Sequence, residues 1–246
     1  MNISRHIMLT AACILISSCG MKSITPEEAA LIYQEIYEKL SDPEYKLPNT
    51  LKTEGYYCEK YENGYEFKIK SLAYHDADEE VFHVSEHISK TTNKETIEEY
   101  FEAWSWKDGE NYYYATSTKS DGEQELFWSY TNTLRTNNLG LENYQDMSLD
   151  IAKEKSELDS RNLNTKFGEN IKWSFQSSGG GSLSHEINGK IKETAYNEKI
   201  CFRDYLLKEY FCMSGNITEH YTFSNRKSAF KKPEIEHYKH VDTIEA

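Results

Sequence analysis

The sequence predicts an α+β protein in which a long antiparallel meander carries an N-terminal helix and one inserted helical segment. Apolar residues recur at helical spacing over residues 25–40. From residue 56 the period changes to two, which is typical of strands with one buried face. Short turn sequences such as Asn63-Gly64 and Asp121-Gly122 separate the alternating segments, as expected for consecutive hairpins.

Residues 1–18 have the layout of a removable export signal. Arg5 precedes an apolar run from Ile7 to Ile16, which is about half the length that a membrane-spanning helix needs. Ile16-Ser17-Ser18-Cys19 then resembles the lipobox of a bacterial lipoprotein. The alternative is an ordinary secretory signal cleaved near Ser17 or Ser18.

The lipobox resemblance implies a diacylglyceryl group on the sulfur of Cys19 and cleavage directly before it. Two or more acyl chains hold a protein stably at a bilayer. We therefore expect the mature protein at the extracytoplasmic face of the cell membrane, with residues 19–24 as a lipid-anchored tether.

A helix is predicted to begin directly after this tether. Thr25 is a suitable N-cap, Pro26 suits the first helical position, and Glu28 completes a capping box. Asp42-Pro43 ends the helix. Its apolar stripe, which we expect to pack on the sheet, consists of Ala29, Ile32, Tyr33, Ile36 and Leu40.

Two sets of strands are expected, before and after a helical interruption at residues 131–170. The first set begins near Tyr56 and continues at 65–70, 82–88, 100–106, 112–118 and 126–130, and the second lies at 171–175, 199–202, 206–213 and 217–223. A helix is predicted at 147–158, a hairpin tip at 177–182 and a further turn at Asn188-Gly189. Residues 25–233 would form one domain, followed by a polar tail at 234–246.

Composition excludes some partners. The formal net charge of −13 argues against nucleic acid and against a basic patch on anionic lipid. Beyond Cys19, the thiols Cys58, Cys201 and Cys212 remain. One disulfide with one free thiol, or three free thiols that pack as small apolar residues, are both open.

The chain carries no catalytic signature, and we expect neither an enzyme nor a cofactor. There is no G-x-S-x-G elbow and no P-loop. His83 and His87 would bind a metal on a helix, but on the predicted strand they lie about 13 Å apart, so no metal site is expected.

Three segments resemble bacterial lipoproteins of the LolA, LolB and LppX type: WSWKDGENYYYATSTKSDGEQELFW (Trp104 to Trp128), KICFRDYLLKEYF (Lys199 to Phe211) and YTFSNRKSAFKKPE (Tyr221 to Glu234). This resemblance, which rests on architecture and turn placement, implies a strongly curved sheet, or half β-barrel. The N-terminal helix and the inserted helices would cover its concave face over an apolar cavity.

The family implication is a carrier or holder of an acyl chain or another hydrophobic ligand, closed by the N-terminal helix and residues 140–160 acting as a lid. Candidate lining residues are Phe67, Ile69, Phe82, Val84, Trp104, Trp106, Trp128, Trp173, Phe175, Phe211 and Phe223. The alternative is a surface module with a filled core, which contacts a protein or polysaccharide through exposed Tyr and Trp. Any protein partner is unknown.

Overall fold

The computed structural model describes residues 20–168 and 171–242. The expected signal peptide and Cys19 lie outside the described residues. The elements, in chain order, are β1 (Lys22–Ile24), α1 (Pro26–Ser41), β2 (Thr50–Lys60), β3 (Glu66–Asp76), β4 (Val81–Thr91), β5 (Thr96–Asp108), β6 (Asn111–Ser120), β7 (Glu123–Thr131), α2 (Leu141–Lys155), α3 (Ser160–Phe167), β8 (Lys172–Gly179), β9 (Ser182–Ile191), β10 (Thr194–Arg203), β11 (Leu206–Ser214), β12 (Ile217–Ser224), a 3-10 turn (Ile235–His237) and β13 (Lys239–His240).

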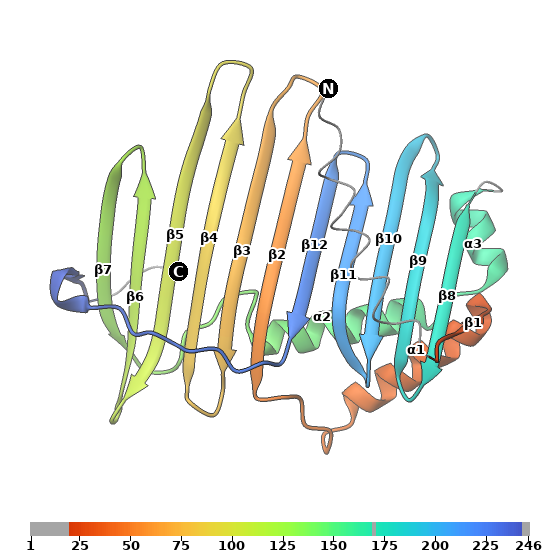
Figure 1. Ribbon diagram of the computed structural model, residues 1–246, viewed down its shortest axis with the longest axis horizontal. Coiled ribbons are helices and arrows are strands. Elements are labelled where there is room, and N and C mark those ends of the chain that lie inside the picture. Colours follow the sequence, from red (N-terminus) through yellow and green to blue (C-terminus); the bar gives the residue numbers. More distant parts are fainter. Residues whose placement is uncertain (1–19, 169–170, 243–246) are drawn as a thin grey trace.

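All thirteen strands belong to one sheet, in the order β1-β8-β9-β10-β11-β12-β2-β3-β4-β5-β6-β7-β13. Figure 1 shows β2 to β12 side by side in this sheet. Neighbouring strands are antiparallel except β13 and β7. The sheet is not closed, because β1 and β13 are its two edges. The pairing of β12 with β2 joins the second set of strands to the first, and this confirms the predicted α+β class.

The first helix forms as the sequence predicts. The Thr25 hydroxyl accepts from the backbone N–H of Glu28, and the Glu28 carboxylate accepts from the backbone N–H of Thr25. Tyr33 and Ile36 of the apolar stripe are fully buried.

The two faces of the sheet are covered differently. One face, here called the helix face, carries α1, α2 and α3 over β8 to β12, and residues 131–140 over β3 to β6. The opposite face, here called the strap face, is crossed by residues 225–238, here called the strap, which run over the lower ends of β2 to β7 (Figure 1). Phe230, Ile235 and Tyr238 of the strap pack on an aromatic cluster that includes Trp106.

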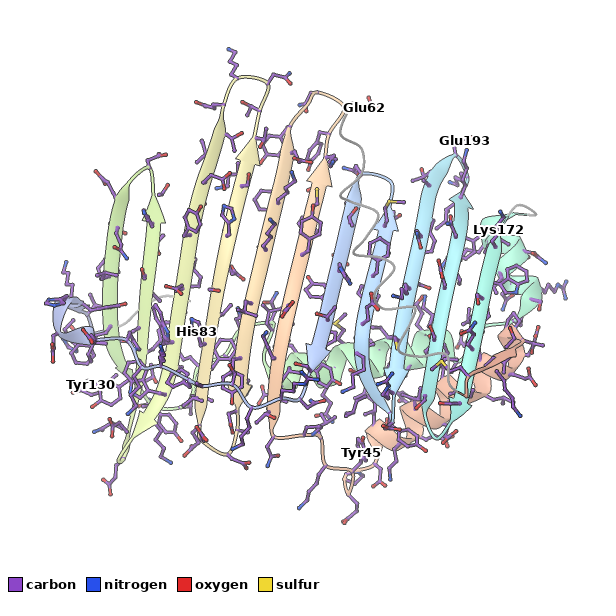
Figure 2. The ribbon with its side chains drawn as sticks, viewed as in Figure 1. Tyr45, Glu62, His83, Tyr130, Lys172 and Glu193 are labelled. Carbon is purple, nitrogen blue, oxygen red and sulfur yellow. The ribbon has the colours of Figure 1, made fainter. Side chains whose placement is uncertain are left out.

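Several local predictions need correction. Asn188 and Gly189 lie inside β9, paired with Asn197 and Tyr196, and the turn falls instead near Glu193 (Figure 2). The interruption holds two helices, α2 and α3, rather than one helix at 147–158. The strand expected from residue 56 begins at Thr50. Residues 234–246 were expected to be a polar tail outside the domain. Instead, Ile235 and Tyr238 pack on the aromatic cluster, and β13 pairs with β7.

The hairpin tip predicted at residues 177–182 is confirmed. The three glycines Gly179 to Gly181 all have positive φ angles of 58–80° at the tip of the β8–β9 hairpin. None of the helices in the described part of the chain has the length and hydropathy needed to cross a bilayer. Cys58, Cys201 and Cys212 are free thiols. Cys201 pairs with Glu209 and Cys212 pairs with Glu198 on the neighbouring strands. Glu209 and Glu198 lie on opposite faces of the sheet, so the two cysteines do as well.

Candidate functional site

The strand register divides the eleven candidate lining residues between the two faces. Phe82 pairs with Ser105 of β5, so the neighbouring Trp104 points to the opposite face. Seven lie on the helix face: Phe67, Ile69, Phe82, Val84, Trp173, Phe175 and Phe223. Four lie on the strap face: Trp104, Trp106, Trp128 and Phe211. They therefore do not line one cavity together. Period-two alternation shows that a strand has two faces, but it does not show which faces of different strands coincide.

Most of the helix face is a filled core. Phe175, Leu183, Ile200 and Phe202 are almost completely buried beneath the helices. The ring of Tyr33, on α1, meets the ring of Phe202 edge-on, with centroids 6.0 Å apart. Close packing of this kind leaves no room for a ligand under α1.

A pocket remains between α2 and strands β11 and β12. Its volume is about 470 Å³, which is within the range of small-molecule sites. The apolar part of its wall consists of Leu139, Tyr144, Met147, Ile151, Tyr210, Tyr221 and Phe223. Of the eleven residues that the sequence predicted, only Phe223 lines this pocket.

The tyrosines of this pocket contribute neutral surface. Burial raises the pKa of Tyr144, Tyr210 and Tyr221, so their hydroxyl groups stay protonated at physiological pH. The Tyr144 hydroxyl donates to the carbonyl oxygen of Leu207 at 3.1 Å, and the Tyr144 ring packs on Phe223 with centroids 5.0 Å apart. Tyr144 thereby fixes α2 against the sheet beside the opening.

Acidic side chains line the same pocket. Asp146, Asp150 and Glu154 come from α2, and Glu219 comes from β12. Three of these acids project from exposed positions of α2. The pocket therefore combines an apolar floor with a negatively charged wall.

A buried polar network lies deeper under the helices. Lys155 of α2 contacts Glu198 of β10, and Glu198 also accepts from the Tyr196 hydroxyl at 2.8 Å. His185 of β9 lies 3.2 Å from the second oxygen of Glu198, and its Nδ1 is 2.8 Å from the Tyr33 hydroxyl. These hydrogen bonds and ion pairs join α1 and α2 to the centre of the sheet.

The charge states in this network follow from opposing effects. Burial by itself would raise the pKa of Glu198, but contact with His185 and the charge of Lys155 outweigh it and lower that pKa to about 2. Burial lowers the pKa of His185, so the imidazole is neutral at neutral pH. Burial opposes the charge of Lys155 too, but Glu198 raises its pKa overall. A charged Lys–Glu pair with a neutral histidine results.

Sequence reasoning missed this network, although a signal was present. Glu198 stands between Tyr196 and Ile200 in a strand whose alternate residues are apolar, and His185 stands between Leu183 and Ile187 in the same way. When the neighbouring residues on the same face of a strand are apolar, a titratable residue between them indicates a buried polar group that needs hydrogen-bond or ion-pair partners. Its partner Lys155 follows Ile151 at helical spacing on α2.

The two histidines that were considered for metal binding lie on the strap face, each beside its own acid. His83 Nε2 is 3.7 Å from Glu102, and His87 pairs with Glu98. No group of three or more His, Cys, Asp or Glu side chains in the described segments is arranged to hold a metal ion.

No protein-family model matches the chain, and a search of curated proteins finds no sequence that is significantly similar to it.

Proposed function

We propose that this protein is a lipid-anchored extracytoplasmic lipoprotein that binds an acyl chain or another amphiphile on the helix face of its sheet. The observation that carries the proposal is the 470 Å³ pocket between α2 and strands β11 and β12, with its floor of aromatic and aliphatic side chains. The proposal takes the sheet as a half-barrel whose concave side is the helix face.

The anchor would hold the β1 edge of the sheet close to the bilayer. Strand β1 begins at Lys22, only three residues after the predicted lipidated Cys19. Three extended residues span at most about 11 Å. The pocket strands β11 and β12 are four and five strands from β1, so about 19–24 Å of sheet lies between the anchored edge and the pocket.

The charge of the pocket wall favours some amphiphiles over others. Asp146, Asp150, Glu154 and Glu219 would repel a carboxylate or phosphate headgroup at the opening. An uncharged or cationic headgroup meets no such repulsion. The proposed ligand is therefore an acyl chain on a neutral carrier such as an acylglycerol, rather than a free fatty acid.

Blocking the pocket tests the proposal. Met147 lines the pocket, so Met147→Trp would fill it, whereas Lys153→Trp adds the same side chain to an exposed position of the same helix. Each variant also carries Cys19→Ser, so that no covalent acyl chain contributes. Bound lipid is extracted with organic solvent and quantified by mass spectrometry, and binding of a fluorescent monoacylglycerol is titrated.

We expect stoichiometric lipid and saturable binding in the Lys153→Trp protein, and a loss of both in Met147→Trp. If the unblocked protein yields no stoichiometric lipid and does not bind the fluorescent probe, the proposal is wrong.

A second candidate function, a surface interaction module, is favoured by a different observation. On the strap face, Tyr100 is 48% exposed and Leu72 is 40% exposed, although both lie on strands away from the sheet edges. Exposed aromatic groups of this kind are enriched where proteins bind partners.

A further inference from the structure

A groove crosses the strands on the strap face, next to the strap. Its volume is about 540 Å³, and it lies over β3 to β7. The floor contains Ser85 and Ser117, which occupy the same cross-strand row as Leu72 and Glu102. The small hydroxyl side chains of Ser85 and Ser117 alternate with the larger Leu72 and Glu102 in this row, and they leave the hollow.

One wall of the groove is a straight row of cross-strand neighbours. The register pairs Lys70 with His87, His87 with Tyr100, Tyr100 with Lys119, and Lys119 with Gln124. Adjacent strands are about 4.8 Å apart, so Lys70 and Lys119 are separated by about 14 Å along this row. That span accommodates several linked sugar units and exceeds the size of a single small ion.

Tyr100 is a preorganised flat platform in this wall. Its ring stacks on His87 with centroids 4.5 Å apart and an angle of 1° between the planes. The imidazole is in turn held by Glu98. Nearly half of the tyrosine surface is still exposed, which leaves part of an oriented ring available to a ligand.

The charge of the wall differs from that of the protein. The chain has a net charge of −13, and the lysines nearby are paired, for example Lys68 with Glu66 and Lys90 with Glu99. In contrast, neither Lys70 nor Lys119 has an ion pair or hydrogen bond with any residue in the described part of the chain. Two uncompensated cations on either side of an exposed ring are complementary to an acidic ligand that also offers a flat apolar face.

A second hollow of about 390 Å³ continues the groove under the strap. It shares Leu72 and Glu102 with the first hollow, and adds Trp104, which stacks on His83 at 5.3 Å (Figure 2 labels His83 beside the strap). Lys231 of the strap also lines it. The same kinds of groups, an aromatic ring and a lysine, thus recur along one continuous surface.

We propose that this groove binds an anionic oligosaccharide, with a sugar ring on Tyr100 and its acid groups at Lys70 and Lys119. Ser85, Ser117 and Gln124 offer both hydrogen-bond donors and acceptors, which match sugar hydroxyl groups. The Glu102 carboxylate in the groove accepts from sugar hydroxyl groups and repels the acid groups, which favours placing those acid groups at the lysines. A peptide strand is a poorer match, because the backbone of β4 and β5 is already paired on both sides and has no free edge. The site is on the opposite face from the acyl-chain pocket and does not depend on it.

The test uses the full chain with Cys19→Ser. Acidic hexasaccharides (galacturonate, alginate and hyaluronate) and a neutral one (maltohexaose) are titrated by calorimetry at low and high salt. We expect at least one acidic hexasaccharide to bind more tightly than the neutral one, with an affinity that falls as salt increases.

Variants locate the binding. Tyr100→Ala is expected to weaken binding by about tenfold, whereas Tyr100→Phe keeps the ring and stays close to the parent protein. Lys70→Ala with Lys119→Ala should weaken binding and flatten its salt dependence. Tyr130→Ala, at another exposed ring on the same face, and Lys172→Ala, on β8, are the matched controls.

Three results would overturn the inference: no binding of any acidic hexasaccharide, equal binding of maltohexaose, or binding that survives both Tyr100→Ala and the double lysine variant. Because Met147→Trp fills only the pocket on the helix face, it should leave saccharide binding unchanged. Failure of the acyl-chain proposal and failure of this one are therefore distinguishable.

Discussion

Lys155 on α2 and Glu198 on β10 form a buried ion pair, with Nζ and Oε2 2.7 Å apart and side chains that are only 7% and 4% exposed. Removing two charges from water costs free energy that their attraction repays only when further hydrogen bonds assist. Tyr196 donates to the same carboxylate oxygen, and Glu154 contacts the same ammonium group. The pair therefore fixes where α2 lies on the sheet, and with it the width of the pocket that α2 helps to form.

Removing one partner should be much worse than neutralising both. Lys155→Met leaves the Glu198 carboxylate buried without its cation, and we expect a loss of about 3–5 kcal/mol in the free energy of unfolding. Lys155→Met with Glu198→Gln should lose less than Lys155→Met alone. Urea denaturation followed by circular dichroism measures both values. A double variant less stable than Lys155→Met would show that the pair does not act as a unit.

Acid should destabilise the protein through His185. Its pKa in the folded protein lies below the ordinary value of about 6.5, because burial disfavours the imidazolium. Below that ordinary value the unfolded chain takes up the proton first, so stability falls as the pH drops from 7 to 5. The slope from one such group reaches at most about 1.4 kcal/mol per pH unit.

The histidine responsible can be identified by substitution. His185→Gln should flatten the fall in unfolding free energy between pH 7 and 5, whereas His237→Gln, at an exposed position, should leave it unchanged. Burial also lowers the pKa of His75 and His83, so part of the slope remains in His185→Gln. An identical slope in His185→Gln and the parent protein would contradict the assignment.

Much of the local structure could be predicted from the sequence, because the signals that set it are local. The capping box at Thr25 and the turn at Asp121-Gly122 act over a few residues. The turn predicted at Asn188-Gly189 was wrong because a contact between distant residues decided the structure there. This pair, which is common in turns, lies inside β9, where Gly189 packs near Ile171. Pairing with β10 over the whole strand outweighed the local preference.

The arrangement of the faces could not be predicted, because it depends on contacts between distant residues. The strap residue Phe230 packs on the cluster that contains Trp106, and the pairing of β12 with β2 joins the two sets of strands into one sheet. Neither contact changes the spacing of apolar residues along the sequence, so neither could be predicted from that spacing. The groove wall is another example, since Lys70 and Lys119 join one row only through the register of four strands.

The strap should shield three of the four tryptophans. Trp106 belongs to the buried cluster on which Phe230, Ile235 and Tyr238 pack, and Trp104 and Trp128 pack on the same cluster. We expect Phe230→Ala with Ile235→Ala to increase quenching of tryptophan fluorescence by acrylamide and to cost about 1–3 kcal/mol of stability. Lys231→Ala, an exposed strap residue, is the control. Unchanged quenching in the double variant would mean that the strap does not cover this cluster in solution.

Membrane attachment should depend on one sulfur atom. If Cys19 carries the acyl chains, Cys19→Ser removes the only proposed anchor, because no helix in the described segments has the character of a membrane span. In a bacterial host that processes lipoproteins, we expect the parent protein in the membrane fraction and labelled by a clickable palmitate analogue. Cys19→Ser should lose the label.

The control for this experiment is Cys13→Ser, which alters a cysteine inside the apolar run of the predicted signal and leaves the lipobox intact. It should remain labelled and membrane-bound. An ordinary secretory signal predicts a different outcome, in which the parent protein is released without label and Cys19→Ser behaves as the parent does. A palmitate label that persists in Cys19→Ser would reject lipidation at this sulfur.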